Sequence, residues 1–100
     1  MTEGGYLYII KNKAWPDWVK IGITENLDKR LNNYQTSSPF RDFEIMYSIY
    51  HPNYRQAEKN IRDTLKPFAT EIKNEWFRVD LSMAKDRLEE QLEEYKTILT

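Results

Sequence analysis

The spacing of apolar residues switches between two periods along this 100-residue chain, and the switch limits the folds that it can adopt. Three segments have the pattern of strands, because aromatic and β-branched side chains either dominate them or alternate with polar ones. These segments are residues 6–10, 18–23 and 43–50. Residues 26–35 and 54–66 instead repeat apolar side chains every three or four positions, like the buried face of a helix. This order of strands and helices predicts an α+β domain with helices packed on a small antiparallel sheet.

A third helix is predicted over residues 80–99, after a short extended piece at residues 75–79. A stripe this long must be buried, and we expect it to pack against the chain's own sheet, with a homodimer seam as the alternative. The apolar positions of the stripe are Leu81, Ala84, Leu88, Leu92, Tyr95 and Leu99.

The composition excludes several kinds of site. The chain has no cysteine, so a disulfide scaffold and a cysteine-based zinc site are both excluded. Its single histidine, His51, rules out a site built from several histidines. The first residues do not resemble a signal peptide, and no apolar run reaches the roughly 18 residues of a membrane helix. We therefore expect a cytoplasmic protein with no membrane partner.

Charge is distributed unevenly, although the net charge is only −1. Residues 80–100 carry three basic and six acidic side chains, whereas residues 1–79 carry twelve basic and ten acidic ones. The mildly basic body predicts weak, salt-sensitive binding of phosphate groups. The acidic last helix would repel a nucleic-acid backbone, so we expect it to lie far from any bound nucleic acid.

Two charged residues lie close to the apolar faces of the predicted helices. Arg30 falls about 40° outside the apolar cluster of its helix, and Glu58 about 50° from the centre of the next helix's apolar face. An Arg can stabilise the charge of a reacting phosphate, and a Glu can hold a hard cation beside it. The alternative is that each charged group lies in water with its stem along the edge of the core.

Lys20 is unusual because it interrupts an otherwise apolar strand. It could pair with a phosphate, or lower the pKa of a nearby tyrosine so that the phenol serves as a base. The alternative is a lysine that faces solvent, and Tyr8 alone would be interpreted as a core residue. The segment from Trp15 to Trp18 could stack a nucleobase, although aromatic anchoring of a loop explains it more simply.

Taken together, these residues resemble the signature of the GIY-YIG nuclease family. The segments that carry the resemblance are Tyr6–Tyr8, Lys20–Gly22 and Lys29–Leu31. Three further segments are similar to those of the family's small phage and bacterial branch: Gln35–Pro39, Ala57–Glu58 and Glu75–Phe77. The resemblance covers about residues 5–79 of a single domain at residues 1–100. It implies a three-stranded antiparallel sheet flanked by helices, which agrees with the order of elements above.

The resemblance also implies roles for particular residues. Tyr8 matches the tyrosine that helps to activate the attacking water, and Arg30 matches the arginine that contacts the scissile phosphate. Glu58 matches the glutamate that holds one Mg²⁺ or Mn²⁺ ion. Gly22 matches a glycine where the backbone passes close to the site, and Lys20 replaces the usual second tyrosine. We expect these groups to share one cleft on one face of the sheet.

The implied function is that of a metal-dependent endonuclease with one divalent ion, acting on nucleic acid; we favour DNA over RNA as the partner, and the sequence leaves this choice open. Further contacts to nucleic acid are expected from Lys11, Lys29, Arg62 and Asn74.

The chain also departs from the family pattern. Tyr6 stands in place of a glycine, Lys20 in place of a tyrosine, and Arg62 where relatives often carry histidine. The alternative is therefore a catalytically weak or inactive module that binds nucleic acid or a protein partner on the same surface, and a purely structural domain is a third possibility.

Overall fold

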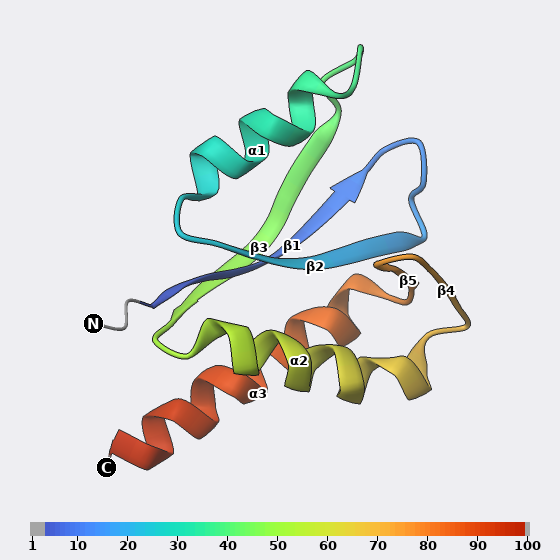
Figure 1. The fold of residues 1–100 in the computed structure, drawn as a ribbon. Coiled ribbons are helices and arrows are strands. Elements are labelled where there is room, and N and C mark those ends of the chain that lie inside the picture. The colour runs from blue at the N-terminus through green and yellow to red at the C-terminus, as the bar shows by residue number, and fades with distance from the viewer. Residues whose placement is uncertain (1–3, 100) are drawn as a thin grey trace.

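A computed structural model describes the backbone of residues 4–99 and the side chains of residues 4–97. It confirms the α+β class and the long C-terminal helix (Figure 1). Among the described residues, no helix combines the length and apolar character that a membrane span requires. The elements are β1 (Gly5–Asn12), β2 (Trp18–Thr24), α1 (Leu27–Thr36), β3 (Phe43–His51), α2 (Tyr54–Leu65), the 3-10 turn η1 (Lys66–Phe68), β4 (Glu71–Lys73), β5 (Trp76–Arg78) and α3 (Leu81–Leu99).

The sheet has five strands in the order β3-β1-β2-β5-β4, and neighbouring strands are antiparallel. The expectation of three strands is therefore wrong. The additional hairpin consists of β4 and β5, which have three residues each. Strands this short do not carry enough alternation to be recognised by period. The hairpin joins the sheet because β5 pairs with Trp18, Val19 and Lys20 at the start of β2.

The two faces of the sheet have different neighbours. The core face carries Leu7, Ile9, Val19 and Ile21, which are fully buried in a cluster with side chains of α2 and α3. The opposite face, called the α1 face here, carries Tyr8 and Ile10 of β1 because strand side chains alternate. Figure 1 shows α1 on one side of the sheet and both α2 and α3 on the other.

A bulge in β3 divides its apolar side chains between the two faces. Ile9 pairs with Tyr47 whereas Ile10 pairs with Ile45, so that Met46 is an extra residue between the two pairs. Ile45 therefore lies on the α1 face, whereas Tyr47 packs against the core cluster. The bulge lets one strand supply apolar side chains to both layers of the molecule.

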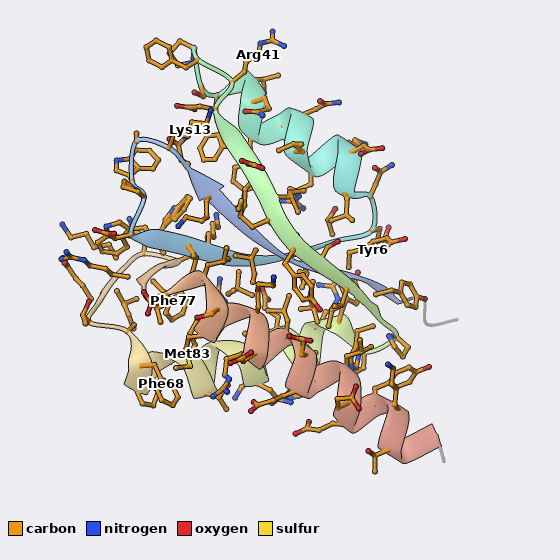
Figure 2. All side chains as sticks on the ribbon, turned by 180° about the vertical axis from the view of Figure 1, so that it is seen from behind. Tyr6, Lys13, Arg41, Phe68, Phe77 and Met83 are labelled. Carbon is orange, nitrogen blue, oxygen red and sulfur yellow. The ribbon has the colours of Figure 1, made fainter. Side chains whose placement is uncertain are left out.

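Helix α3 packs within the chain, against α2 and β3. Ala84 and Leu88 are fully buried in the core cluster, and Leu92 packs against it. Figure 2 shows Phe77 where the sheet meets the beginning of α3. The stripe predicted for this helix thus covers the core face, as expected, and the side chain of Leu99 lies outside the described part.

Candidate functional site

The edge of β2 is open over its second half, and two helices approach it from opposite faces. In the described sheet β5 pairs with β2 only as far as Lys20, which leaves the segment from Ile21 to Thr24 without a strand on that side. Helix α1 begins three residues beyond β2, and Asn26 caps it by accepting a hydrogen bond of 3.0 Å from the backbone N–H of Lys29. Arg30 of α1 and Arg55 of α2 line a common pocket of about 540 Å³ at this edge.

Tyr8 reaches toward the open edge across Gly22, its partner in the β1–β2 pairing. A Cβ atom built on Gly22 would stand 2.9 Å from Cε1 of Tyr8 and would overlap its hydroxyl oxygen. The tyrosine is only 1% exposed, and its hydroxyl lies 3.2 Å from that of Tyr34 in α1. Glycine at position 22 is thus the residue that leaves room for the ring.

The Tyr8 hydroxyl is influenced by charges from both helices. Burial, followed by the hydrogen bond with Tyr34, raises its pKa far above the ordinary value. Arg30 lowers this pKa and Glu58 raises it, so both charged groups act on the same hydroxyl. With its pKa raised in this way, Tyr8 is a protonated phenol at neutral pH.

Lys20 is paired with a carboxylate that the sequence did not single out. Its Nζ lies 3.3 Å from Oε2 of Glu75, and Arg62 Nη2 donates a 3.0 Å hydrogen bond to Oε1 of the same side chain. Lys20 and Arg62 together lower the pKa of Glu75, the hydrogen bond from Arg62 being the largest cause. Glu75 thus joins strand β2 to helix α2 at the beginning of the open edge.

Glu58 is less firmly held. Its carboxylate lies 3.8 Å from Nε of Arg62 and accepts no hydrogen bond within the described part of the chain. Nε of Arg62 is itself buried without a hydrogen-bond partner there. Only 23% of the Glu58 side chain is exposed. Burial is the largest cause that raises the pKa of Glu58, and the positive charge of Arg62 opposes this increase. A carboxylate in this state would be stabilised by an added cation.

The expected cleft on one sheet face is wrong in its geometry. Ala57 and Ile61 bury α2 against the core face, whereas Tyr34 of α1 contacts Tyr8 on the α1 face. Arg30 and Glu58 therefore approach from opposite faces and act on the Tyr8 hydroxyl at the open edge of β2. The sequence could not show this, because helical period gives the buried side of a helix but not the face of the sheet that it covers.

The donor groups fit one divalent ion with few protein ligands. No cluster of three or more His, Cys, Asp or Glu side chains that could hold a metal occurs in the described residues. Mg²⁺ keeps several waters and is often bound by one or two carboxylates and substrate phosphates. The half-buried carboxylate of Glu58, without a hydrogen bond from the described residues, suits such an ion.

The other predicted contact residues are spread over the molecule. Lys29 lines the same pocket as Arg30, and Arg62 is engaged by Glu75. Asn74 lies in the β4–β5 turn with a positive φ of 55°. Lys11 faces away from the α1 face, where its Nζ donates a hydrogen bond to the carbonyl of Pro16. Lys11 is therefore separate from the other candidates.

Sequence reasoning did not assign a site role to Tyr34 or Glu75. Tyr34 lies in the predicted helix at residues 26–35, and nothing in the spacing of its apolar residues indicates a contact with Tyr8. Glu75 begins one of the segments that carry the family resemblance, but its link to Lys20 depends on the β2–β5 pairing. Short strands hide such contacts from the sequence.

Comparison with known proteins decides between families. The model of the T5orf172 domain matches residues 5–95, and no curated protein or solved structure matches the chain. T5orf172 domains are nuclease-like, DNA-binding domains, so the function of the chain is related to nucleic acid. The resemblance to GIY-YIG nucleases rested on short, separated segments with departures at Tyr6, Lys20 and Arg62, and it is corrected by this match. Because the match spans most of its length, the chain belongs to the T5orf172 domain family, which is distinct from the GIY-YIG family.

Proposed function

We propose that this domain is a metal-dependent endonuclease that hydrolyses phosphodiester bonds at the open edge of β2, in DNA rather than RNA. The observation that carries the proposal is the Tyr8 hydroxyl, which is buried and lies under the influence of both Arg30 and Glu58. A guanidinium and a carboxylate from two helices thus act electrostatically on one phenol of the sheet. These are groups suited to orient water, stabilise a phosphate and hold a hard cation.

Arg30 is the group that binds the phosphate. Its side chain is exposed and makes no ion pair or hydrogen bond with the described residues. It lines a pocket with Lys29 and Arg55, so three cations face the same space. A guanidinium offers several N–H donors in a fixed plane, which matches phosphate oxygens well and stabilises the charge that develops on them during hydrolysis.

Glu58 is the group that binds the ion, Mg²⁺ or Mn²⁺. Glu58 would hold such an ion, which would supply positive charge to stabilise the phosphate during hydrolysis. Arg62 lies beside the carboxylate at 3.8 Å, a distance that leaves Glu58 able to exchange this neighbour for a cation. Arg62 retains its stronger contact with Glu75.

Tyr8 positions the attacking water. Because burial keeps its pKa high, the hydroxyl stays protonated and acts through hydrogen bonding rather than as a base. Tyr34 fixes the direction of the hydroxyl from 3.2 Å. Lys20 attracts the substrate when an incoming phosphate competes with Glu75 for its ammonium group.

The rival function is binding without catalysis. It is favoured by the pairing of both Lys20 and Arg62 with Glu75, so that two of the cations beside the site already share one carboxylate. Such a domain would hold nucleic acid through the exposed cations Lys29, Arg30 and Arg55 alone.

Nicking of supercoiled plasmid separates these functions. The wild-type protein should nick DNA in Mg²⁺ or Mn²⁺ and should stop when a chelator is added. Glu58→Gln should abolish nicking, whereas Glu44→Gln on the exposed side of β3 serves as the control and should cleave at the wild-type rate. Cleavage by Glu58→Gln at the parent rate would show that Glu58 is not the ligand. Wild-type binding without any nicking would establish the rival function.

A further inference from the structure

A second pocket lies next to the proposed cleavage site. It has a volume of about 370 Å³ and lies between the β1–β2 loop and the β4–β5 turn. It is lined by Trp15, Trp18, Lys73, Asn74 and Trp76. None of these residues takes part in the chemistry proposed above, yet the three tryptophans of the chain all contribute to this one pocket.

The strand register places the pocket on the same side of the sheet as Tyr8. Lys20 pairs with Trp76 and Tyr8 pairs with Gly22 of the same strand. Paired residues in antiparallel strands share a face, as do residues two positions apart in one strand. Trp76 thus projects from the α1 face beside Lys20. Helix α1 packs on β3, which β1 and β2 separate from β5 in the strand order, and this leaves the tryptophans accessible.

The aromatic rings are held by one another. Trp15 and Trp76 make an edge contact with centroids 5.9 Å apart, and Phe43 contacts both rings, with its centroid 6.4 Å from that of Trp76 and 6.5 Å from that of Trp15. Trp15 nevertheless remains 49% exposed. An exposed ring with neighbours that fix its position is a preformed stacking surface, because little side-chain freedom is lost when a flat ligand binds.

The polar groups around the rings specify the kind of ligand. Lys20 on one side of Trp76 and Lys73 on the other are cations, although Glu75 and Glu71 accompany them. The Asn74 side chain at the rim offers both a donor and an acceptor. These groups match a ligand that has a flat aromatic ring, hydrogen-bonding edges and a negative charge. A nucleotide has all three properties.

We propose that this pocket holds an unpaired nucleobase of the nucleic acid whose backbone lies along the open edge of β2. The inference rests on the proposed function and identifies its substrate class: nucleic acid with unpaired nucleotides, such as a single strand, a gap or a branch. Paired strand residues have Cβ atoms about 5 Å apart. A base beside Trp76 therefore places its own phosphate near Lys20, whose Nζ lies 5.3 Å from the ring of Tyr34, the hydrogen-bond partner of Tyr8.

The test compares strands with and without bases, in a chelator so that no cleavage occurs. The probes are a fluorescein-labelled oligothymidylate and an abasic strand of the same length. Wild-type protein should bind the oligothymidylate at least about fivefold more tightly than the abasic strand, because stacking of bases is lost in the latter. Equal affinity for the two strands would overturn the proposal without the use of any variant.

Variants then locate the effect. Trp15→Ala should remove the preference for bases, and Trp15→Phe should keep it because phenylalanine also stacks. Phe40→Ala is the matched control, since Phe40 is 81% exposed and lies outside the pocket. A preference that survives in Trp15→Ala would overturn the assignment to this pocket.

The result is also separable from the test of the nuclease. A preference for bases in a protein that never nicks DNA would support the pocket and contradict the proposed hydrolysis. Metal-dependent nicking by a protein that binds both strands equally would support hydrolysis and contradict the pocket.

Discussion

The ring of Tyr8 fills the space that a methyl group on Gly22 would need. The two residues pair across β1 and β2, so the relationship depends on the register of these strands. It sends the tyrosine hydroxyl to the open edge of β2, where Arg30 and Glu58 both influence it. The glycine thus determines where the proposed chemistry takes place.

Gly22→Ala should destabilise the protein by about 1–3 kcal/mol, because the added methyl group displaces the ring of Tyr8 from a packed site. Urea denaturation measures the change in the free energy of unfolding. In a Tyr8→Ala background the same substitution should cost little, since the obstructing ring is gone. An equal cost in both backgrounds would show that the methyl group clashes with something other than Tyr8.

Glu58→Gln should stabilise the fold at neutral pH. Burial raises the pKa of Glu58, so the folded state favours the protonated carboxyl and loses stability as pH rises through this raised pKa. The gain in the free energy of unfolding should vanish at about pH 3.5, where the carboxyl is protonated in the folded and unfolded states alike.

Glu75→Gln provides a control of opposite sign. The pKa of Glu75 is lowered, chiefly by the hydrogen bond from Arg62, so loss of this carboxylate should destabilise the fold at neutral pH. Thermal unfolding at both pH values measures the two effects. Destabilisation by Glu58→Gln at neutral pH would mean that its pairing with Arg62 outweighs the burial of the carboxylate.

Glu75→Gln should also strengthen the binding of nucleic acid. Removal of the carboxylate releases Lys20 and Arg62, and affinity at low salt should increase about two- to fivefold, in line with the strength of an exposed ion pair. The dependence on salt should become steeper because more cations contact phosphates. Asp63→Asn is the control for net charge, because it also removes one negative charge, here from an ion pair on α2. Equal gains in both variants would indicate a general effect of net charge.

Leu88→Ala should lower the free energy of unfolding by about 2–5 kcal/mol, because the side chain of Leu88 in α3 is fully buried in the core cluster. Glu89→Ala, one position along on the exposed side of the helix, should leave the free energy of unfolding nearly unchanged. Truncation after Val79 removes α3 altogether and should unfold the domain at any protein concentration. A truncated protein that stays folded and loses only self-association would contradict the role of α3 in the core.

Long periodic segments made most of the fold predictable. The apolar spacing of residues 54–66 and 80–99 identified α2 and α3, and both bury the expected side chains. The extended piece expected at residues 75–79 contains β5, whereas β4 was missed because it has only three residues. The bulge at Met46 also escaped, since the regular alternation of β3 gave no sign that its apolar side chains divide between two faces.

The sequence suggests candidate residues for the site but not how they are arranged. Arg30 and Glu58 are candidates because they lie at the margins of the apolar faces of their helices. Whether the two helices cover the same face of the sheet depends on tertiary packing, which a single sequence does not reveal. The link from Lys20 to Glu75 follows from a pairing between a long strand and a very short one. The closeness of Tyr34 to Tyr8 arises from the way α1 lies on the sheet.

The most direct test of the proposed hydrolysis compares two neighbouring cations of α1. Arg30 acts on the Tyr8 hydroxyl, whereas Lys29 lines the same pocket without that influence. The rate of plasmid nicking in Mg²⁺ or Mn²⁺ should fall about 100-fold or more in Arg30→Ala, as for the loss of a donor that stabilises charge in a transition state. It should change only a few-fold in Lys29→Ala. Equal rates for the two variants, or a wild-type protein that never nicks DNA, would contradict the account.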